Sequence, residues 1–335
     1  MIRFMNILSG VQWETSFILQ FQQSPSWLQY IMEIFTFMGY PQAYMLVIAV
    51  IYWAFDRKLG MRMAVFLPFC AVTNSLLKQA FHAPRPYWTD IRITGMHADS
   101  GFGMPSGHAQ SSTVWILGAV YLRKVWFWII AIIVTLMVGV SRSYLGVHFP
   151  SQILAGWITG LLILMVFIRL EGRVLSWIGR TSLSQQIWVL LLSSAGMILL
   201  GLLLVMLLKI WEMPEAWILN TQKYLSLSKA GLQSYGMASV SGNTGSFLGV
   251  ALGAVLMNVR GNFNIGGTWT RKLLRVVIGI IILGSLFTGI QFFEPGNDRM
   301  LQYSVWRFAG FFIISFSAVF ILPLLFRRIG LMGTG

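Results

Sequence analysis

The chain is poor in charged residues and in cysteine. Only 10% of its 335 residues are charged, whereas a soluble domain usually carries about 25%. The single cysteine, Cys70, excludes an intrachain disulfide. The first residues lack the sustained apolar core and the small-residue cleavage site of a secretory signal peptide. The low share of charged residues disfavours a soluble domain and is typical of a chain that needs little water-facing surface.

Long apolar runs fill most of the chain. Hydrophobic residues make up 56% of the sequence, and their runs approach the length of about 20 residues that a helix needs to cross a bilayer. We therefore predict an all-α fold, a polytopic transmembrane helical bundle of about nine spans. The predicted spans are 41–55, 61–80, 106–122, 125–143, 150–168, 186–208, 233–258, 273–292 and 304–326.

The excess of basic residues predicts the orientation of this bundle. The chain has 24 Lys and Arg against ten Asp and Glu, a net charge of +14. Nine alternating spans place fourteen of these cations and two of the acids on one side. Because cationic loops mark the cytoplasmic side, we predict a cytoplasmic C-terminus and an N-terminus outside. Orientation accounts for the charge, so no nucleic-acid partner is expected.

The first of three polar clusters closes the second predicted span, on the outer side. Lys78 ends that span, and Arg85 follows it directly before Pro86. A single lysine at a span end often only extends its charge to the interface. This cluster alone therefore does not predict a site.

The second cluster begins the third predicted span. It reads Pro105-Ser106-Gly107-His108. The Ser106 hydroxyl and the Gly107 N–H lie at the positive end of a predicted helix, which suits a phosphate group. Taken alone, the same residues are better explained as a helix cap.

The third cluster joins the fourth and fifth predicted spans. It contains Ser141-Arg142, then His148, then Gln152. An arginine and a histidine near membrane depth are costly unless they have partners or water. A lone histidine at this place is equally well explained as a hydrogen-bonded core residue.

The three clusters together predict a phosphate site. Lys78, Arg85 and Arg142 would repel one another strongly unless an anion joined them. Ser106 and Gly107 add neutral donors, and two histidines complete the set. Phosphoryl transfer requires charge compensation on the phosphoryl oxygens, an in-line nucleophile and an acid for the leaving group. The clusters contain all of these.

The clusters resemble the signature motifs of the type-2 phosphatidic acid phosphatase superfamily, which are Lys-x6-Arg-Pro, Pro-Ser-Gly-His and Ser-Arg-x5-His-x3-Asp. The resemblance covers about residues 45–170. It implies that His148 attacks phosphorus, that His108 protonates the leaving oxygen, and that a phosphohistidine forms. It also implies that no metal ion or other cofactor takes part. The residues implied to hold the phosphoryl oxygens are Lys78, Arg85, Ser106, Gly107 and Arg142.

The third motif departs from the superfamily pattern at its last position. Gln152 stands where aspartate is usual, four residues after His148 and so one helical turn away. Its amide oxygen can orient the ring of the nucleophile but brings no charge. The glucose-6-phosphatase branch looks similar here, with His-Phe-Pro-x-Gln and Arg-Pro-Tyr-Trp, and the dolichyl diphosphatase branch also carries glutamine. A protein that has lost its activity is the alternative.

One outer loop holds further residues of metal-binding type. They are His82, Asp90, His97 and Asp99. Their spacing matches no common metal site, so we interpret them as a solvated loop.

The sequence predicts three consecutive segments. Residues 1–40 form an amphipathic or partly inserted segment, residues 41–180 a catalytic core of five spans, and residues 181–335 a membrane extension of four spans. We expect an integral membrane phosphatase of a bacterial plasma membrane, with its active site on the extracytoplasmic face. The preferred substrate is a lipid monophosphate or diphosphate, such as phosphatidic acid, phosphatidylglycerophosphate or an isoprenyl diphosphate. The alternatives are a soluble sugar phosphate such as glucose 6-phosphate, and a phosphate-binding membrane protein or transporter without catalysis.

Overall fold

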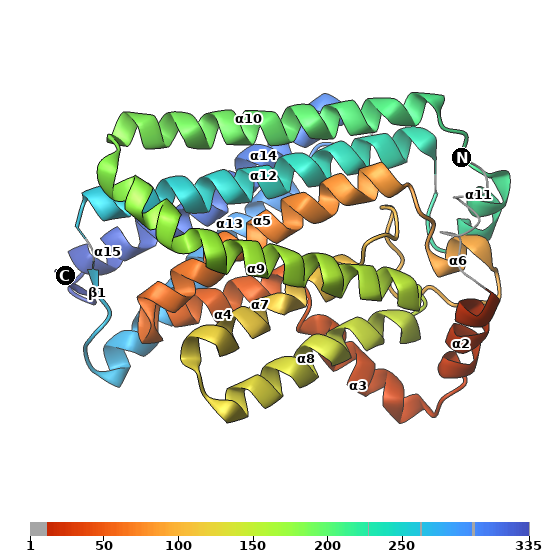
Figure 1. Ribbon diagram of the computed structural model, residues 1–335, viewed down its shortest axis with the longest axis horizontal. Coiled ribbons are helices and arrows are strands. Elements are labelled where there is room, and N and C mark those ends of the chain that lie inside the picture. Colours follow the sequence, from red (N-terminus) through yellow and green to blue (C-terminus); the bar gives the residue numbers. More distant parts are fainter. Residues whose placement is uncertain (1–11, 227, 262, 297–298, 335) are drawn as a thin grey trace. The chain divides into compact units, whose positions relative to one another are not determined.

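The computed structural model describes residues 12–226, 228–261, 263–296 and 299–334, and these residues are almost entirely helical (Figure 1). The helical class predicted from the sequence is therefore confirmed. Two-residue strands β1 (Phe263–Asn264) and β2 (Gly333–Thr334) pair antiparallel. The helices are α2 (Gln12–Gln22), α3 (Ser26–Phe37), α4 (Pro41–Val50), α5 (Arg57–Phe81), α6 (Pro86–Thr89), α7 (Gly107–Leu122), α8 (Val125–Tyr144), α9 (Pro150–Arg180), α10 (Leu183–Leu207), α11 (Glu215–Thr221), α12 (Lys229–Val259), α13 (Trp269–Phe292), α14 (Met300–Phe316) and α15 (Leu322–Arg328), with short π-helical or 3₁₀ segments at Ile51–Phe55, Leu208–Ile210 and Ser317–Ile321.

Seven of the described helices are long and apolar enough to cross a membrane, and an eighth span results if the bent pair Ser26–Phe37 and Pro41–Phe55 counts as one. The prediction of a polytopic membrane protein is therefore confirmed, whereas the number nine and the orientation stay predictions. One of the nine predicted spans, 106–122, corresponds to α7, which has only sixteen residues. At 1.5 Å per residue it is about 24 Å long, less than the roughly 30 Å of a hydrocarbon core.

The helices form two compact units, each assembled from separated stretches of the chain. The first unit contains the described residues up to Tyr40, those of Thr73–Met165 and those of Gly201–Met237. In it α8 packs against both α3 and α7, and α6 packs against α11. Its core is rich in buried aromatic side chains. The rings of Trp88 and Trp217 lie 5.7 Å apart, so α11 packs on α6, the short helix whose N-cap is Arg85.

The second unit contains Pro41–Val72, Val166–Leu200 and Ala238–Gly335. Arg275 of α13 is fully buried there and donates hydrogen bonds to four backbone carbonyls, including those of Trp53 (2.8 Å) and Ile265 (2.7 Å). This arginine therefore ties α13 to the segments around it. Neither unit is a single stretch of sequence, and the three consecutive segments predicted above stay a prediction. Residues 1–11 of the first segment lie outside the described residues.

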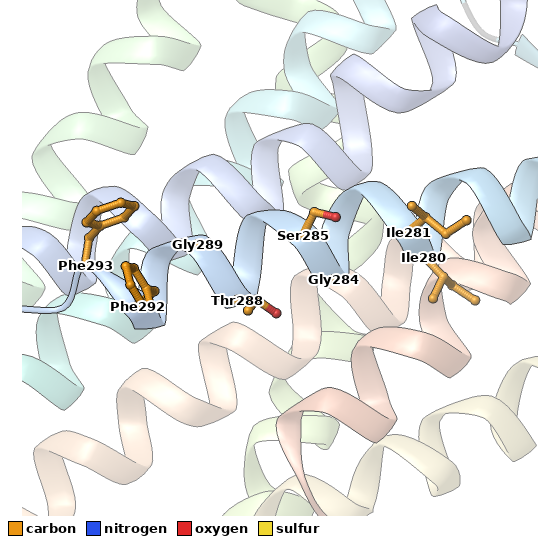
Figure 2. Close-up of a pocket in the computed structure, with 8 residues that line it drawn as sticks. All are labelled: Ile280, Ile281, Gly284, Ser285, Thr288, Gly289, Phe292 and Phe293. Atoms are coloured by element: carbon orange, nitrogen blue, oxygen red, sulfur yellow. The ribbon is translucent and has the colours of Figure 1, made fainter.

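A shallow pocket in the second unit lies along one face of α13 (Figure 2). Its polar side chains are the hydroxyls of Ser285 and Thr288, and it has no charged or imidazole side chain. The remaining lining residues are Ile280, Ile281, Gly284, Gly289, Phe292 and Phe293. This pocket lacks the groups that phosphoryl transfer requires, and the predicted site residues lie in the first unit.

Candidate active site

The three motifs meet in the first unit because each lies at the end of a helix. Lys78 is in the last turn of α5 and Arg142 in the last turn of α8. Ser106 is the N-cap of α7, and His148 lies in the loop between α8 and α9. The backbone N–H of Ser106 donates to the carbonyl of Gln152 at 2.9 Å, so the second and third motifs are joined directly.

Arg85 is a fully buried cation with a partner for most of its donors. Its Nε donates to the Gly101 carbonyl at 2.6 Å, and its Nη2 pairs with Oδ2 of Asp99 at 2.6 Å. Burial alone would raise the pKa of Asp99, but the charges of Arg85 and Lys78 outweigh it and hold that pKa below its usual range. Asp99 is therefore a carboxylate that fixes the direction of the guanidinium.

Gln152 fixes the orientation and the tautomer of His148. Its Nε2 donates to the Pro84 carbonyl at 2.7 Å, and its Oε1 accepts the Phe149 N–H at 3.2 Å. The same oxygen faces Nδ1 of His148 at 3.2 Å. Since this oxygen can only accept, we assign the ring proton to Nδ1 and the lone pair to Nε2.

The lone-pair nitrogen of His148 lies beside the fixed arginine. Its Nε2 is 3.5 Å from Nη1 of Arg85. Burial, and then the charges of Arg85 and Lys78, hold the pKa of His148 well below its usual range. The imidazole is therefore neutral at neutral pH, as a nitrogen nucleophile must be.

Three buried polar atoms of the motifs have no hydrogen-bond partner within the described part of the chain. They are Oγ of Ser106, Nε2 of His108 and Nε of Arg142. Buried polar groups nearly always have partners, and an unsatisfied one costs about 1–3 kcal/mol. Lys78 is close enough to Arg85 and Arg142 to interact with both electrostatically. A ligand with several acceptor oxygens would satisfy these donors together.

Gly107 is the first residue of α7, between the Ser106 cap and His108. The first N–H groups of a helix have no acceptor within it. A Cβ at Gly107 would lie 3.0 Å from Oδ1 of Asn74, so a larger residue would require a small shift of the Asn74 side chain or of the helix start. The two predicted neutral donors, Ser106 and Gly107, are thus adjacent at one helix end.

The last turn of α3 and the turn that follows it contribute contacts that the sequence motifs do not predict. Nη1 of Arg142 donates to the hydroxyl of Thr36. The ring of Tyr40 meets the ring of His108 edge-on, with centroids 5.0 Å apart. A Cβ at Gly39 would lie 2.6 Å from Cδ2 of His108. The end of α3 therefore contacts an expected phosphate ligand, and the turn after it contacts the expected acid.

Replacing Gly39 by alanine is expected to lower kcat about 10- to 100-fold, because the new methyl group would displace the ring of His108 and a shift of about 1 Å is sufficient for such a loss. The measurement is phosphate release by the purified protein. Gly172→Ala is the matched control, since a Cβ there would meet nothing within 4 Å. Equal activity of the two variants would contradict this role of the turn.

The two aspartates of the outer loop, Asp90 and Asp99, form ion pairs with arginines. Asp99 pairs with Arg85, and Asp90 pairs with Arg92 at 2.6 Å. The hydrogen bonds to Arg92 hold the pKa of Asp90 below its usual range. Among the described residues no group of three His, Cys, Asp or Glu side chains is placed to hold a metal ion. Asp99, interpreted above as part of a solvated loop, is instead the partner of a motif arginine.

Two parts of the chain match models of protein families. Residues 59–175 match the PAP2 superfamily, and residues 242–334 match the transmembrane extension of PAP2 superfamily phosphatases. The first match contains every motif residue named above. The turn after α3 and the segment Gly201–Met237 lie outside both matches.

Several characterised proteins are similar to this chain. Phosphatidylglycerophosphatase B of Bacillus subtilis is 31% identical over 163 residues, which cover 44% of this chain and 77% of the relative. Undecaprenyl-diphosphatase of Sulfolobus acidocaldarius is 27% identical over 117 residues, covering 35% and 57%. Glucose-6-phosphatase catalytic subunit 1 of Haplochromis nubilus is 28% identical over 214 residues, covering 54% and 58%. The chain thus spans less than two thirds of the length of the last two.

One solved structure is also similar, that of a transmembrane PAP2 type phosphatidylglycerolphosphate phosphatase from Bacillus subtilis. The identity is 22% and the TM-score 0.40, over 52% of this chain and 94% of that chain. A likeness at this level adds nothing to the fold described above.

Proposed function

The chain belongs to the PAP2 superfamily, and from that premise we propose that it is an integral membrane phosphatase that hydrolyses a phosphate monoester or diphosphate through a phosphohistidine on His148. One observation carries the proposal: the lone pair assigned to Nε2 of His148 lies 3.5 Å from Nη1 of Arg85. A guanidinium in that position binds a phosphoryl oxygen beside the attacking nitrogen.

In the proposed complex the phosphoryl group takes the place between the unsatisfied donors. Arg85, Arg142 and Lys78 compensate the charge of its oxygens, and Ser106 and Gly107 donate neutral hydrogen bonds. The support for this is that Oγ of Ser106 and Nε of Arg142 are buried without partners among the described residues. Substrate oxygens would satisfy both.

The reaction proceeds in two steps. Nε2 of His148 attacks phosphorus and forms a P–N bond, while the bond from phosphorus to the leaving oxygen breaks and takes its electron pair with it. His108 gives its proton to that oxygen. In the second step His108 takes a proton from water, whose oxygen attacks phosphorus. The P–N bond breaks, its electrons return to His148, and phosphate leaves.

No step of this scheme needs a metal ion or another cofactor. The charge that a metal would neutralise on the phosphoryl oxygens is met by Lys78, Arg85 and Arg142, and the nucleophile is a side chain rather than a metal-bound water. Activity is therefore expected to persist in the presence of a chelator.

We place the active site on the extracytoplasmic side of a bacterial plasma membrane. The support is the distribution of Lys and Arg over nine alternating spans, which predicts the N-terminus outside and the C-terminus in the cytoplasm. Reporter fusions after Arg328 and within the loop 90–100 are expected to report opposite sides. The same side for both would overturn the orientation.

The proposed substrate is a lipid phosphate or lipid diphosphate. Support comes from relatives named for phosphatidylglycerophosphate and undecaprenyl diphosphate. A relative named for glucose 6-phosphate, together with the glutamine at position 152, favours a soluble sugar phosphate as the second candidate. These matches cover only parts of the chains, so the choice between the two substrate classes is made by measuring phosphate release.

The test is phosphate release by detergent-purified protein, with a chelator present, from phosphatidylglycerophosphate, an isoprenyl diphosphate and glucose 6-phosphate. Preference for either lipid by kcat/KM supports the proposal, and preference for glucose 6-phosphate replaces it with the second candidate. Release from none of them would mean that the site binds phosphate without cleaving esters.

A further inference from the structure

Glu14 is a buried carboxylate to which the proposed chemistry gives no role. It lies in the first turn of α2, outside the residues that match the superfamily model. Its exposure is 1%, and among the described residues it is the one buried acid. A carboxylate is rarely buried unless its oxygens are paired, so its partners are informative.

Both carboxylate oxygens of Glu14 bind one residue, Ser151, which is 137 positions away in the chain. Oε1 accepts the backbone N–H of Ser151 at 2.6 Å, and Oε2 accepts its hydroxyl at 3.2 Å. Ser151 is the second residue of α9, where N–H groups lack acceptors within the helix and a negative charge is stabilising. Glu14 therefore caps α9 from another helix.

The capped turn is the one that aims the nucleophile. Ser151 lies between His148 and Gln152, and Gln152 holds both Nδ1 of His148 and the N–H of Phe149. A shift of the first turn of α9 moves Gln152, and with it the imidazole. The contact of Glu14 is thus one residue away from the group that orients His148.

The other end of α2 is fixed to the same region. The side-chain amide of Gln22 donates to the carbonyls of Thr94 (2.8 Å) and Tyr144 (3.0 Å), and it accepts the N–H of Thr94 (3.1 Å). The ring of Phe21 meets that of Tyr144 edge-on at 5.1 Å. Since both ends of α2 are anchored, Glu14 is held at a defined place relative to α9.

From these contacts we propose that Glu14 is a positioning residue for His148, acting through the first turn of α9. The proposal rests on the proposed function, because it assigns a role within that reaction. Glu14 does not touch substrate. It sets the direction of Nε2 and leaves the phosphate-binding arginines where they are.

The expected result for Glu14→Ala is a fall in kcat of about 10- to 50-fold with KM within twofold, because misdirection of the nucleophile affects the chemical step. Glu14→Gln keeps an acceptor for the Ser151 N–H and is expected to stay within fivefold of wild type. Glu215→Ala is the matched control, since Glu215 is an exposed carboxylate in the first turn of α11. Its activity is expected to be unchanged.

A double-mutant cycle separates positioning from loss of structure. If Glu14 acts through Gln152, the effects of Glu14→Ala and Gln152→Asn on kcat are less than additive, whereas a general loss of folded protein adds to any other effect. Rates are divided by the amount of folded protein, measured by thermal unfolding in detergent. The inference would be overturned if Glu14→Ala had the kcat of wild type per amount of folded protein, or if the effects of the two substitutions on kcat were fully additive. Inactive wild-type protein would instead overturn the proposed function.

Discussion

Replacement of His148 by alanine is expected to lower the rate of phosphate release by at least about 10⁴-fold, the scale seen when a covalent nucleophile is removed. The loss is expected for every ester that the wild type cleaves, because the same nitrogen attacks phosphorus whatever the leaving group. KM is expected to change little, since Arg85 keeps its bonds to Asp99 and Gly101. The measurement is single-turnover phosphate release with a chelator present.

The covalent intermediate provides a second readout. Rapid acid-free quenching with ³²P-labelled substrate is expected to label wild-type protein, and the label is expected to be lost in acid and kept in alkali, as for a P–N bond. The label should be absent from His148→Ala and present in His82→Ala, whose ring packs on Phe102 and Trp211. Label retained by His148→Ala would assign the nucleophile to another residue.

The roles of the two motif histidines are separable by the leaving group. His108→Ala is expected to keep far more of its rate on p-nitrophenyl phosphate than on an alkyl ester, because nitrophenolate leaves without a proton. His148→Ala is expected to lose both activities equally. A His108→Ala variant with equal losses on both esters would remove the acid role from His108.

The motif residues were predictable from the sequence because their spacing is local and their chemistry is shared. Lys78, Arg85, Ser106, Arg142 and His148 each lie where an apolar run ends. A charge or an imidazole at such a place needs a partner, so several of them in order predict a common site. The helical membrane fold was predictable for the same reason, since lipid requires that the backbone bond within each helix.

The supporting residues were not predictable, because their partners are distant in the chain. Glu14 and Thr36 lie in the N-terminal segment. Glu14 bonds to Ser151, next to Gln152, and Thr36 bonds to Arg142, each more than a hundred positions away. Neither carries a motif of its own. The sequence interpretation places Asp99 in a solvated loop and assigns it no partner. Only the fold brings its carboxylate to Arg85.

The sequence does not decide whether glutamine at position 152 supports catalysis or marks a protein that has lost its activity. Change of Gln152 to the aspartate that is usual in the superfamily is expected to lower kcat about 10- to 100-fold, not to raise it. The amide donates to the Pro84 carbonyl and accepts the Phe149 N–H at once. An aspartate is one methylene shorter and has no N–H to donate. It leaves the Pro84 carbonyl unsatisfied, at a cost of about 1–3 kcal/mol, and 1.4 kcal/mol corresponds to a tenfold change in rate.

Two further substitutions separate length from charge. Gln152→Asn keeps the amide and shortens the side chain, and Gln152→Glu keeps the length and replaces the N–H donor by a carboxylate oxygen. Both are expected to lower kcat, because each loses the bond to Pro84 for a different reason. Gln152 also lies close to Gly103, where an added Cβ would be 2.7 Å from its Oε1.

The pH dependence of kcat/KM distinguishes a site that uses the Gln152 amide from a site that has lost the negative charge of the usual aspartate. Burial and the neighbouring cations lower the pKa of His148, so the acid limb of kcat/KM that reports this group is expected below about pH 6.5 in the wild type. A carboxylate in Gln152→Glu favours the imidazolium and raises that pKa, so the limb moves to higher pH and less nucleophile is neutral at neutral pH.

If instead Gln152→Asp or Gln152→Glu were more active than wild type at pH 7, the site would be one that lost its aspartate and retained only phosphate binding. A lower activity in all three variants means that the site is built around an amide, with the orientation of His148 set by hydrogen bonds and its reactivity by Arg85.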